Sequence, residues 1–354
     1  MHFDITDEQR MITDSVARLL QDDTPGDAET WASIREMGAV AMAFPEESGG
    51  IGSPYEDMVF ALTEFGKAGS DAAFIANAML PGAMVRGARV ADEDMLTALS
   101  EGRARAAVAI AGKASVLPEL VDGRVSGRWS GVVGGADADV IFLSVRNGDT
   151  VEFHVVSRDA PGLKVEASDL IDGRGAAVVT VDGLALSDET RVDLGNVDGA
   201  ERLELLNDVG AFAMGADALG AIETIRDMTL DYLKTRKQFG VAIGSFQVLQ
   251  HAMVDLAHEA EQFRSIVYRA ACALDGVDAD ARRLAVSSLK RQVNTRLRPA
   301  GMSAIQMHGG IGVTEEYALG RLVKRLLVAD MLFGSADDHA RRLRDLFADG
   351  KALV

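Results

Sequence analysis

RKQFGVAIGSFQVLQH, from Arg236 to His251, separates two long runs of helical periodicity. Arg236 and Gln238 come just before a Phe-Gly pair at the end of the first run, and a second helix is expected from about Ser245. The planar guanidinium of an arginine suits a phosphate, and a neighbouring aromatic ring can stack on a flat ligand. The plainer interpretation is a helix hairpin with Gly240 as its C-cap and Arg236 beside the negative end of the helix dipole. For this segment alone, the plainer interpretation is favoured.

A second segment, QMHGGIGVTEEY from Gln306 to Tyr317, follows about 70 residues later. Gly309, Gly310 and Gly312 would let a ligand or another backbone approach closely, and Gln306 offers an amide donor and acceptor. The alternative is an ordinary glycine loop between helices, because a GGxG pattern alone is a weak signal.

Outward from these segments, the chain has a helix, strand, helix order. Residues 4 to about 105 show helical spacing, with Thr6 as a candidate N-cap of the first helix and a turn-rich PEESGGIGSP break. Short β-branched runs between Gly and Asp turns indicate a small β domain over 106–195. Helical segments are expected again around 203–235, 246–275, 280–305 and 317–347. The fold class is therefore α+β.

Composition narrows the function classes. The 354 residues carry 36 Lys and Arg against 54 Asp and Glu, a net charge of −18, which disfavours nucleic acid and anionic membrane as partners. Positive charge gathers around Arg236 and in Arg321, Lys324 and Arg325. The acidic N-terminus does not resemble a signal peptide, so a cytoplasmic location is expected. Cys272 is the only cysteine and is expected to be an inert packing thiol, with no metal site.

In combination, the two segments resemble the acyl-CoA dehydrogenase family. The N-terminal FDITDEQ, the WASIREMGAVAMAFPEESGGIG stretch and the order of the elements also match, so the resemblance covers nearly the whole chain. It implies an N-terminal helical domain over 1–105, a small β-barrel or sandwich domain over 106–195 and a C-terminal four-helix bundle over 200–354. It also implies FAD, bound at a subunit interface.

The resemblance assigns one group of FAD contacts, made in trans to the partner subunit's flavin site. The positions that match this pattern are Arg236, Gln238, Phe239, Phe246, Gln306, Gly309 and Gly310.

The cis contacts of the family do not match. The corresponding stretch, AVAIAGKASVLPEL over 107–120, lacks the Thr-Glu and Gly-Ser-Asp of the family pattern. Val132 and Val133 stand where a polar Ile-Thr pair is expected, and Trp129 is expected to be a packing residue.

The catalytic carboxylate is also missing. The resemblance places the base at one of two positions, and these are Phe333 and Gly210 here, with Ala211 where an Arg is usual. Nearby acids are expected to be solvated helix charges; they are Glu315, Glu316, Asp330 and Asp337. Glu204 or Asp208 could serve only if the alignment shifts by a helical turn. The catalytic set is therefore expected to be empty.

This pattern is most similar to the shortened, non-catalytic subunit of heteromeric (α2β2) acyl-CoA dehydrogenases of actinobacterial sterol side-chain catabolism. The resemblance implies a catalytic partner subunit that binds the acyl-CoA substrate, and an electron-acceptor flavoprotein. Two alternatives stay open: a self-sufficient homo-oligomeric FAD dehydrogenase with an unrecognised base, and a scaffold protein without flavin.

Overall fold

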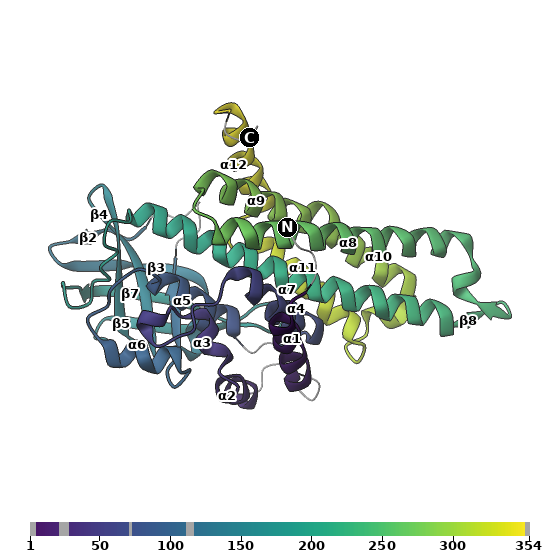
Figure 1. Ribbon diagram of the computed structural model, residues 1–354, viewed down its shortest axis with the longest axis horizontal. Helices are drawn as coiled ribbons and strands as arrows, with labels where there is room; N and C mark the ends of the chain where they lie inside the picture. Colours follow the sequence, from purple (N-terminus) through teal and green to yellow (C-terminus); the bar gives the residue numbers. More distant parts are fainter. Residues whose placement is uncertain (1–4, 21–27, 71–72, 111–116, 351–354) are drawn as a thin grey trace. The chain divides into compact units, whose positions relative to one another are not determined.

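The computed structural model describes residues 5–20, 28–70, 73–110 and 117–350, and its contacts divide the chain into two compact units (Figure 1). The first unit comprises Met1–Asp23, Tyr55–Ser70 and Ala211–Val354, and the second comprises Thr24–Pro54 and Asp71–Gly210. The three domains with boundaries near residues 105 and 195–200 stay a prediction.

The first unit is helical. Its helices are α1 (Asp7–Leu20), α4 (Tyr55–Ala68), the later part of α7 (Gly199–Thr235), α8 (Gln247–Asp275), α9 (Ala279–Gln292), α10 (Arg298–His308), α11 (Ala318–Met331) and α12 (Ala336–Ala348). Thr6 is confirmed as the N-cap of α1, because its Oγ1 accepts from the Gln9 amide at 3.1 Å and Gln9 Oε1 accepts from the Thr6 amide at 3.1 Å.

Glycines let α4 and α7 cross closely. A Cβ added to Gly66 would lie 1.9 Å from the Asp217 carbonyl oxygen, and one added to Gly220 would lie 1.9 Å from the Thr63 carbonyl oxygen. The Asp217 side chain forms a buried ion pair with Arg325 of α11 at 2.5 Å. Arg325 therefore does not belong to the basic face that the sequence suggested, because its charge is matched inside the core.

The helix expected over 317–347 is wrong as a single segment. α11 ends at Met331 and α12 begins at Ala336. Phe333 and Gly334 between them have φ of 56° and 99°, which no α-helix tolerates, and Ser335 starts α12 with a capping box to Asp338. The other three helical segments are confirmed, with a π-helical turn, Val293–Leu297, joining α9 to α10.

The helices of the second unit are short. They are α2 (Ala28–Glu36), α3 (Ala39–Ala43), a π-helix (Ile75–Met79) that continues into α5 (Leu80–Val85), α6 (Glu93–Ser100) and the first part of α7. The WASIREMGAVAMAF stretch forms two helices, because Gly38 at φ 76° separates them.

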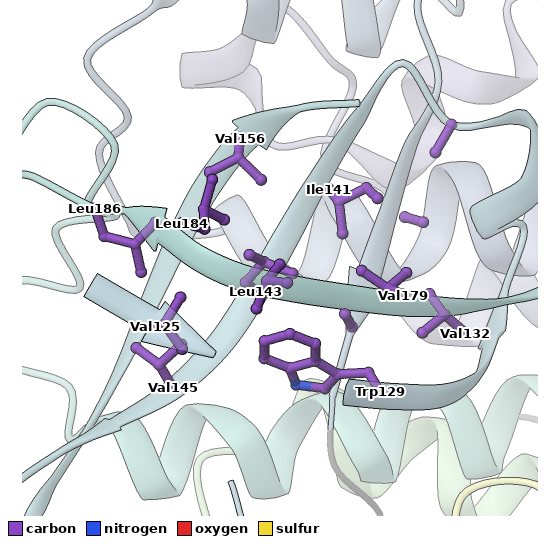
Figure 2. Close-up of a cluster of buried hydrophobic side chains, with 14 residues drawn as sticks. Val125, Trp129, Val132, Ile141, Leu143, Val145, Val156, Val179, Leu184 and Leu186 are labelled. Atoms are coloured by element: carbon purple, nitrogen blue, oxygen red, sulfur yellow. The ribbon is translucent and has the colours of Figure 1, made fainter. Parts of the chain in front are cut away.

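Two sheets complete the second unit. One has the order β1 (Ala106–Ala109), β4 (Val140–Asn147), β5 (Thr150–Ser157), with β1 parallel to β4. The other has the antiparallel order β2 (Leu120–Val121), β3 (Arg124–Val133), β7 (Gly175–Ala185), β6 (Leu163–Asp169). Both sheets contribute to one apolar core, where Trp129 is 2% exposed and packs as predicted (Figure 2). The α+β class is confirmed.

Helix α7 is the one helix in the described part of the chain that is long and apolar enough to span a bilayer. Of its most apolar 18-residue window, 89% is buried. Burial of this kind is typical of the core helix of a folded protein.

Candidate functional site

The segment after α7 forms a two-stranded hairpin, not a helix C-cap. β8 (Lys237–Gln238) pairs with β9 (Val241–Ala242), and Phe239 and Gly240 form the turn. Their φ angles, 53° and 81°, are those of a two-residue hairpin turn with both central residues left-handed. Gly240 therefore belongs to this turn, which corrects the plainer interpretation of the sequence. Figure 1 shows β8 beyond the end of α7.

Arg236 is held by its backbone and leaves its side chain exposed. Its amide donates to the Tyr232 carbonyl at 2.9 Å, and its carbonyl accepts from the Ile243 amide at 2.8 Å. Within the described ranges, no partner is found for the Arg236 guanidinium or for the Gln238 side chain, both exposed. These polar groups are available to a ligand.

The two phenylalanines of the segment meet each other. Phe239 is 91% exposed, Phe246 at the N-cap of α8 is 36% exposed, and their rings lie edge to face with centroids 6.2 Å apart. An exposed aromatic pair of this kind gains little from burial within the chain, so its apolar surface is free to contact a flat ring.

The second segment ends α10 in a glycine turn. Gln306 lies exposed on the last turn of α10, and Gly309 follows the helix with φ 65° and ψ −140°, a combination that disfavours residues with a Cβ. A Cβ built on Gly309 or on Gly310 would meet no atom within 4 Å. The bare backbone of this turn therefore faces open space.

These residues fit a flavin dinucleotide in their chemistry. An unpaired guanidinium suits the pyrophosphate, the exposed rings suit a flat ring system, and bare glycine backbone allows close approach of the rest of the molecule. If FAD is held here, Arg236, Gln238, Phe239, Phe246, Gln306, Gly309 and Gly310 are the residues that would hold it.

A residue that the sequence interpretation missed joins the two segments. His308, the last residue of α10, stacks on Tyr232 of α7 with ring centroids 4.5 Å apart and an interplanar angle of 24°. Tyr232 precedes Arg236 by one helical turn, so the contact brings the end of α7 to the glycine turn. An aromatic-type ring in the last turn of both helices is the signal that could have indicated it.

The two positions that the sequence resemblance assigns to the base, Phe333 and Gly210, have different surroundings. Phe333 lies in the break between α11 and α12, where its carbonyl accepts from His339 Nε2 at 3.0 Å. The Nζ of Lys290 caps the end of α11 by donating to the Ala329 and Leu332 carbonyls. Burial lowers the pKa of Lys290 to about 7. This break is therefore held by buried polar groups and carries an aromatic side chain.

The other acids differ in their surroundings. Glu315, Glu316 and Asp337 are exposed, as expected. Asp330 is not a solvated charge: its side chain is 13% exposed, accepts from Asn294 Nδ2 at 2.8 Å and lies 3.8 Å from Arg298. This corrects the expectation for Asp330, whose carboxylate serves to connect helices.

The second position that the resemblance assigns to the base, Gly210, is buried in α7. Asp208, two residues earlier, is 1% exposed. The stretch aligned with the cis flavin contacts is described only in part, because residues 111–116 lie outside the described residues.

Cys272 lines a cavity of about 540 Å³ formed by α1, α4, α7 and α8 in the first unit. Burial raises the pKa of its thiol to about 11, with the neighbouring Glu56 acting in the same direction. A thiol of this kind is a poor nucleophile at neutral pH, as expected. Charged side chains on the cavity wall pair with one another, among them Lys67 with Glu64 and Arg264 with Glu223. No group of metal-binding side chains occurs in the described ranges.

The chain is similar to known acyl-CoA dehydrogenases along its length. It is 27% identical to the acyl-CoA dehydrogenase IpdE2 of Mycobacterium tuberculosis, over 95% of this chain and 96% of that protein. It is 26% identical to the probable acyl-CoA dehydrogenase YngJ of Bacillus subtilis, over 95% and 97% of the two chains.

Solved structures share the fold. The ChsE4–ChsE5 complex from Mycobacterium tuberculosis matches with a TM-score of 0.87 at 20% identity, over 99% of both chains. A variant of the Tcur3481–Tcur3483 steroid ACAD matches with a TM-score of 0.87 at 24% identity, over 99% and 100% of the two chains. Glutaryl-CoA dehydrogenase from Mycobacterium smegmatis, solved with FADH2, matches with a TM-score of 0.85 at 17% identity, over 99% and 96%.

Two family models match the chain. The N-terminal domain of acyl-CoA dehydrogenase matches residues 6–88, and the C-terminal domain matches residues 199–345. Together with the full-length relatives and the shared fold, these matches show that the chain belongs to the acyl-CoA dehydrogenase family.

Proposed function

We propose that this chain is a non-catalytic subunit of an FAD-dependent acyl-CoA dehydrogenase. It supplies the trans FAD contacts, and a catalytic partner subunit supplies the base and the acyl-CoA pocket. One contrast carries this proposal: an exposed set of flavin-type contacts lies at the ends of α7 and α10 and at the start of α8, whereas Phe333 and Gly210 occupy the positions that the resemblance assigns to the base.

Family membership supports FAD as the cofactor. When bound, FAD accepts the hydride from the β-carbon of the acyl thioester. The α-proton must be removed by a carboxylate whose pKa is raised in an apolar pocket, and this chain has no such group at either family position. The residues of this chain therefore bind and orient FAD, and the partner subunit carries out the proton transfer.

Two similarities support the finer parts of the proposal. The chain matches the ChsE4–ChsE5 complex and the Tcur3481–Tcur3483 steroid ACAD over nearly its full length. Both names pair two chains, which favours a heteromeric assembly such as α2β2. The second name favours a bulky steroid side-chain CoA thioester as the substrate. An electron-acceptor flavoprotein completes the proposed set of partners.

The test compares this chain alone with the chain co-expressed with a neighbouring dehydrogenase gene product. We expect flavin absorbance and activity only in the co-purified assembly, with a mass that contains both chains. Flavin and activity from this chain alone would favour the self-sufficient enzyme, and no flavin even with the partner would favour the scaffold.

Arg236→Ala in the co-expressed assembly tests the site itself. Loss of a charge-assisted contact to the pyrophosphate should weaken FAD binding by about tenfold or more. Lys234→Ala is the matched control, because it removes an equal charge from the last turn of α7 at a position outside the proposed contacts. Unchanged FAD occupancy in Arg236→Ala would show that the assignment of the site is wrong.

A further inference from the structure

Three rings form a connected group at the junction of the two proposed FAD segments. His308 is 3% exposed, stacks on Tyr232 at 4.5 Å, and lies against Tyr317 with ring centroids 5.3 Å apart. Tyr232 belongs to α7 before Arg236, and His308 lies directly before Gly309. A nearly buried imidazole therefore stands between the arginine hairpin and the glycine turn.

Hydrogen bonds fix how the imidazole is turned. Nδ1 lies 2.8 Å from the Ala304 carbonyl oxygen, and since a carbonyl can only accept, Nδ1 carries a proton and donates. Nε2 lies 3.2 Å from the Tyr317 hydroxyl, which can donate to it. With a partner on each nitrogen and a ring on its face, the His308 side chain has one orientation.

The backbone on either side of the group belongs to the proposed contacts. The Tyr232 carbonyl accepts from the Arg236 amide at 2.9 Å, which fixes the start of the hairpin. On the other side, a Cβ on Gly312 would lie 3.0 Å from His308 Cβ, so the glycine turn packs back onto this residue. Gly309 and Gly310 face open space instead. His308 thus supports the glycine turn on the side opposite the open space that Gly309 and Gly310 face.

We propose that His308 is a positioning residue, which with Tyr232 and Tyr317 sets the spacing between Arg236 and the Gly309–Gly310 backbone so that both meet one FAD molecule. The inference rests on the proposed function. It adds a mechanism to the proposed function: the two segments bind FAD as a unit, because the His308 ring holds them at a fixed spacing.

Three substitutions separate the contributions of the group. His308→Phe keeps a ring against Tyr232 and removes both hydrogen bonds, and we expect FAD affinity in the co-expressed assembly to fall about tenfold. Tyr317→Phe removes only the hydroxyl partner of Nε2, and we expect a loss of about threefold to fivefold. The third, Tyr268→Phe on α8, is the control, because it removes a tyrosine hydroxyl outside this group, on the wall of the cavity near Cys272; affinity should be unchanged.

A double-mutant cycle distinguishes positioning from general stability. If His308 acts through Arg236, His308→Phe should cause little further loss of FAD affinity in the Arg236→Ala background. Equal losses in both backgrounds, or no loss in His308→Phe, would overturn the positioning role alone. No effect of Arg236→Ala would overturn the proposed FAD site, and the inference with it. The melting temperature of the flavin-free assembly, recorded for every variant, shows whether a loss of affinity follows from unfolding.

Discussion

At the scale of single residues, two phenylalanines have unusual backbone angles. Phe239 has φ 53° and Phe333 has φ 56°, and each is followed by a glycine at positive φ. A bulky side chain in the left-handed region is strained, by about 1 kcal/mol. Phe239 is also 91% exposed, so burial within the chain does not offset this strain. Strain together with exposure fits a residue whose contact lies outside the chain.

Phe239→Gly should therefore separate stability from function. Glycine adopts positive φ without strain, so the free energy of unfolding of the isolated chain should stay constant or rise by up to about 1 kcal/mol. FAD affinity of the co-expressed assembly should fall, because the exposed ring is lost. Urea unfolding and FAD titration measure the two effects. A variant that binds FAD like the wild type would contradict the assignment of Phe239.

Lys290 should make stability depend on pH. Burial lowers its pKa from 10.5 to about 7 in the folded state. Between these values the unfolded chain binds more protons than the folded chain, so stability rises with pH from about 7 to about 10, by at most about 1.4 kcal/mol per pH unit. Below pH 7 both states are protonated, and this contribution to the slope vanishes.

Lys290→Met tests this dependence. In urea unfolding from pH 7.5 to 9.5, the free energy of the wild type minus that of the variant should increase with pH. Lys324→Met, which removes an exposed lysine from α11, should keep the wild-type slope. Parallel curves for the wild type and Lys290→Met would mean that Lys290 stays charged in the folded state across this range.

At the scale of elements, the break between α11 and α12 depends on one glycine. Gly334 has φ 99°, and a Cβ there would lie 2.8 Å from His339 Nε2. Gly334→Ala should lower the free energy of unfolding by about 2 kcal/mol or more, from strain and displacement of the buried His339. Gly173→Ala is the matched control: its φ is 91° with no atom within 4 Å, so only the backbone strain of about 1 kcal/mol applies. If thermal or urea unfolding shows equal losses of unfolding free energy in the two variants, the contact with His339 does not contribute to the effect.

Local signals explain which elements could be predicted. Thr6 and Gln9 predict the start of α1, because a capping box is encoded within four residues. The break at Phe333 also has a local signal, because Gly334 is followed by Ser335 and Asp338 at capping-box spacing, and the sequence interpretation did not use it. The contacts from Lys290, which lies far away in the sequence, could not be predicted. The surroundings of Asp330 could not be predicted either, because its partners Asn294 and Arg298 lie more than 30 residues away.

The candidate site shows the same division. The residue types at Arg236 and Gln306–Gly310 could be assigned from motif resemblance, because each motif is contiguous. The hairpin at Phe239–Gly240 was not predicted because Phe-Gly is a weaker turn signal than Asn-Gly or Asp-Gly. The stack of Tyr232 on His308 could not be predicted, because it depends on how the ends of α7 and α10 meet in three dimensions. The sequence therefore indicates which ligand the residues suit, and tertiary packing determines how the two segments are spaced relative to each other.

At the scale of the whole molecule, a net charge of −18 opposes binding of a polyanion such as CoA. The positive charges that remain exposed near the proposed site, Lys234, Arg236 and Lys237, cluster at the end of α7. Of the three, only Arg236 is assigned to the pyrophosphate of FAD, and the two lysines are too few to offset the overall negative charge for a second phosphate-rich ligand. CoA binding should therefore depend on the partner subunit.

Calorimetric titration with CoA tests this division of labour. The co-expressed assembly should bind CoA, and this chain alone should not, either at about 10 mM salt or at 1 M, where the Debye length shortens from about 30 to about 3 Å. The two salt conditions distinguish two possible reasons why this chain alone does not bind CoA. If the chain has no CoA pocket, screening its charge changes nothing. If binding appears at high salt, the chain has a pocket that only repulsion keeps empty, and the assignment of the acyl-CoA site to the partner is contradicted.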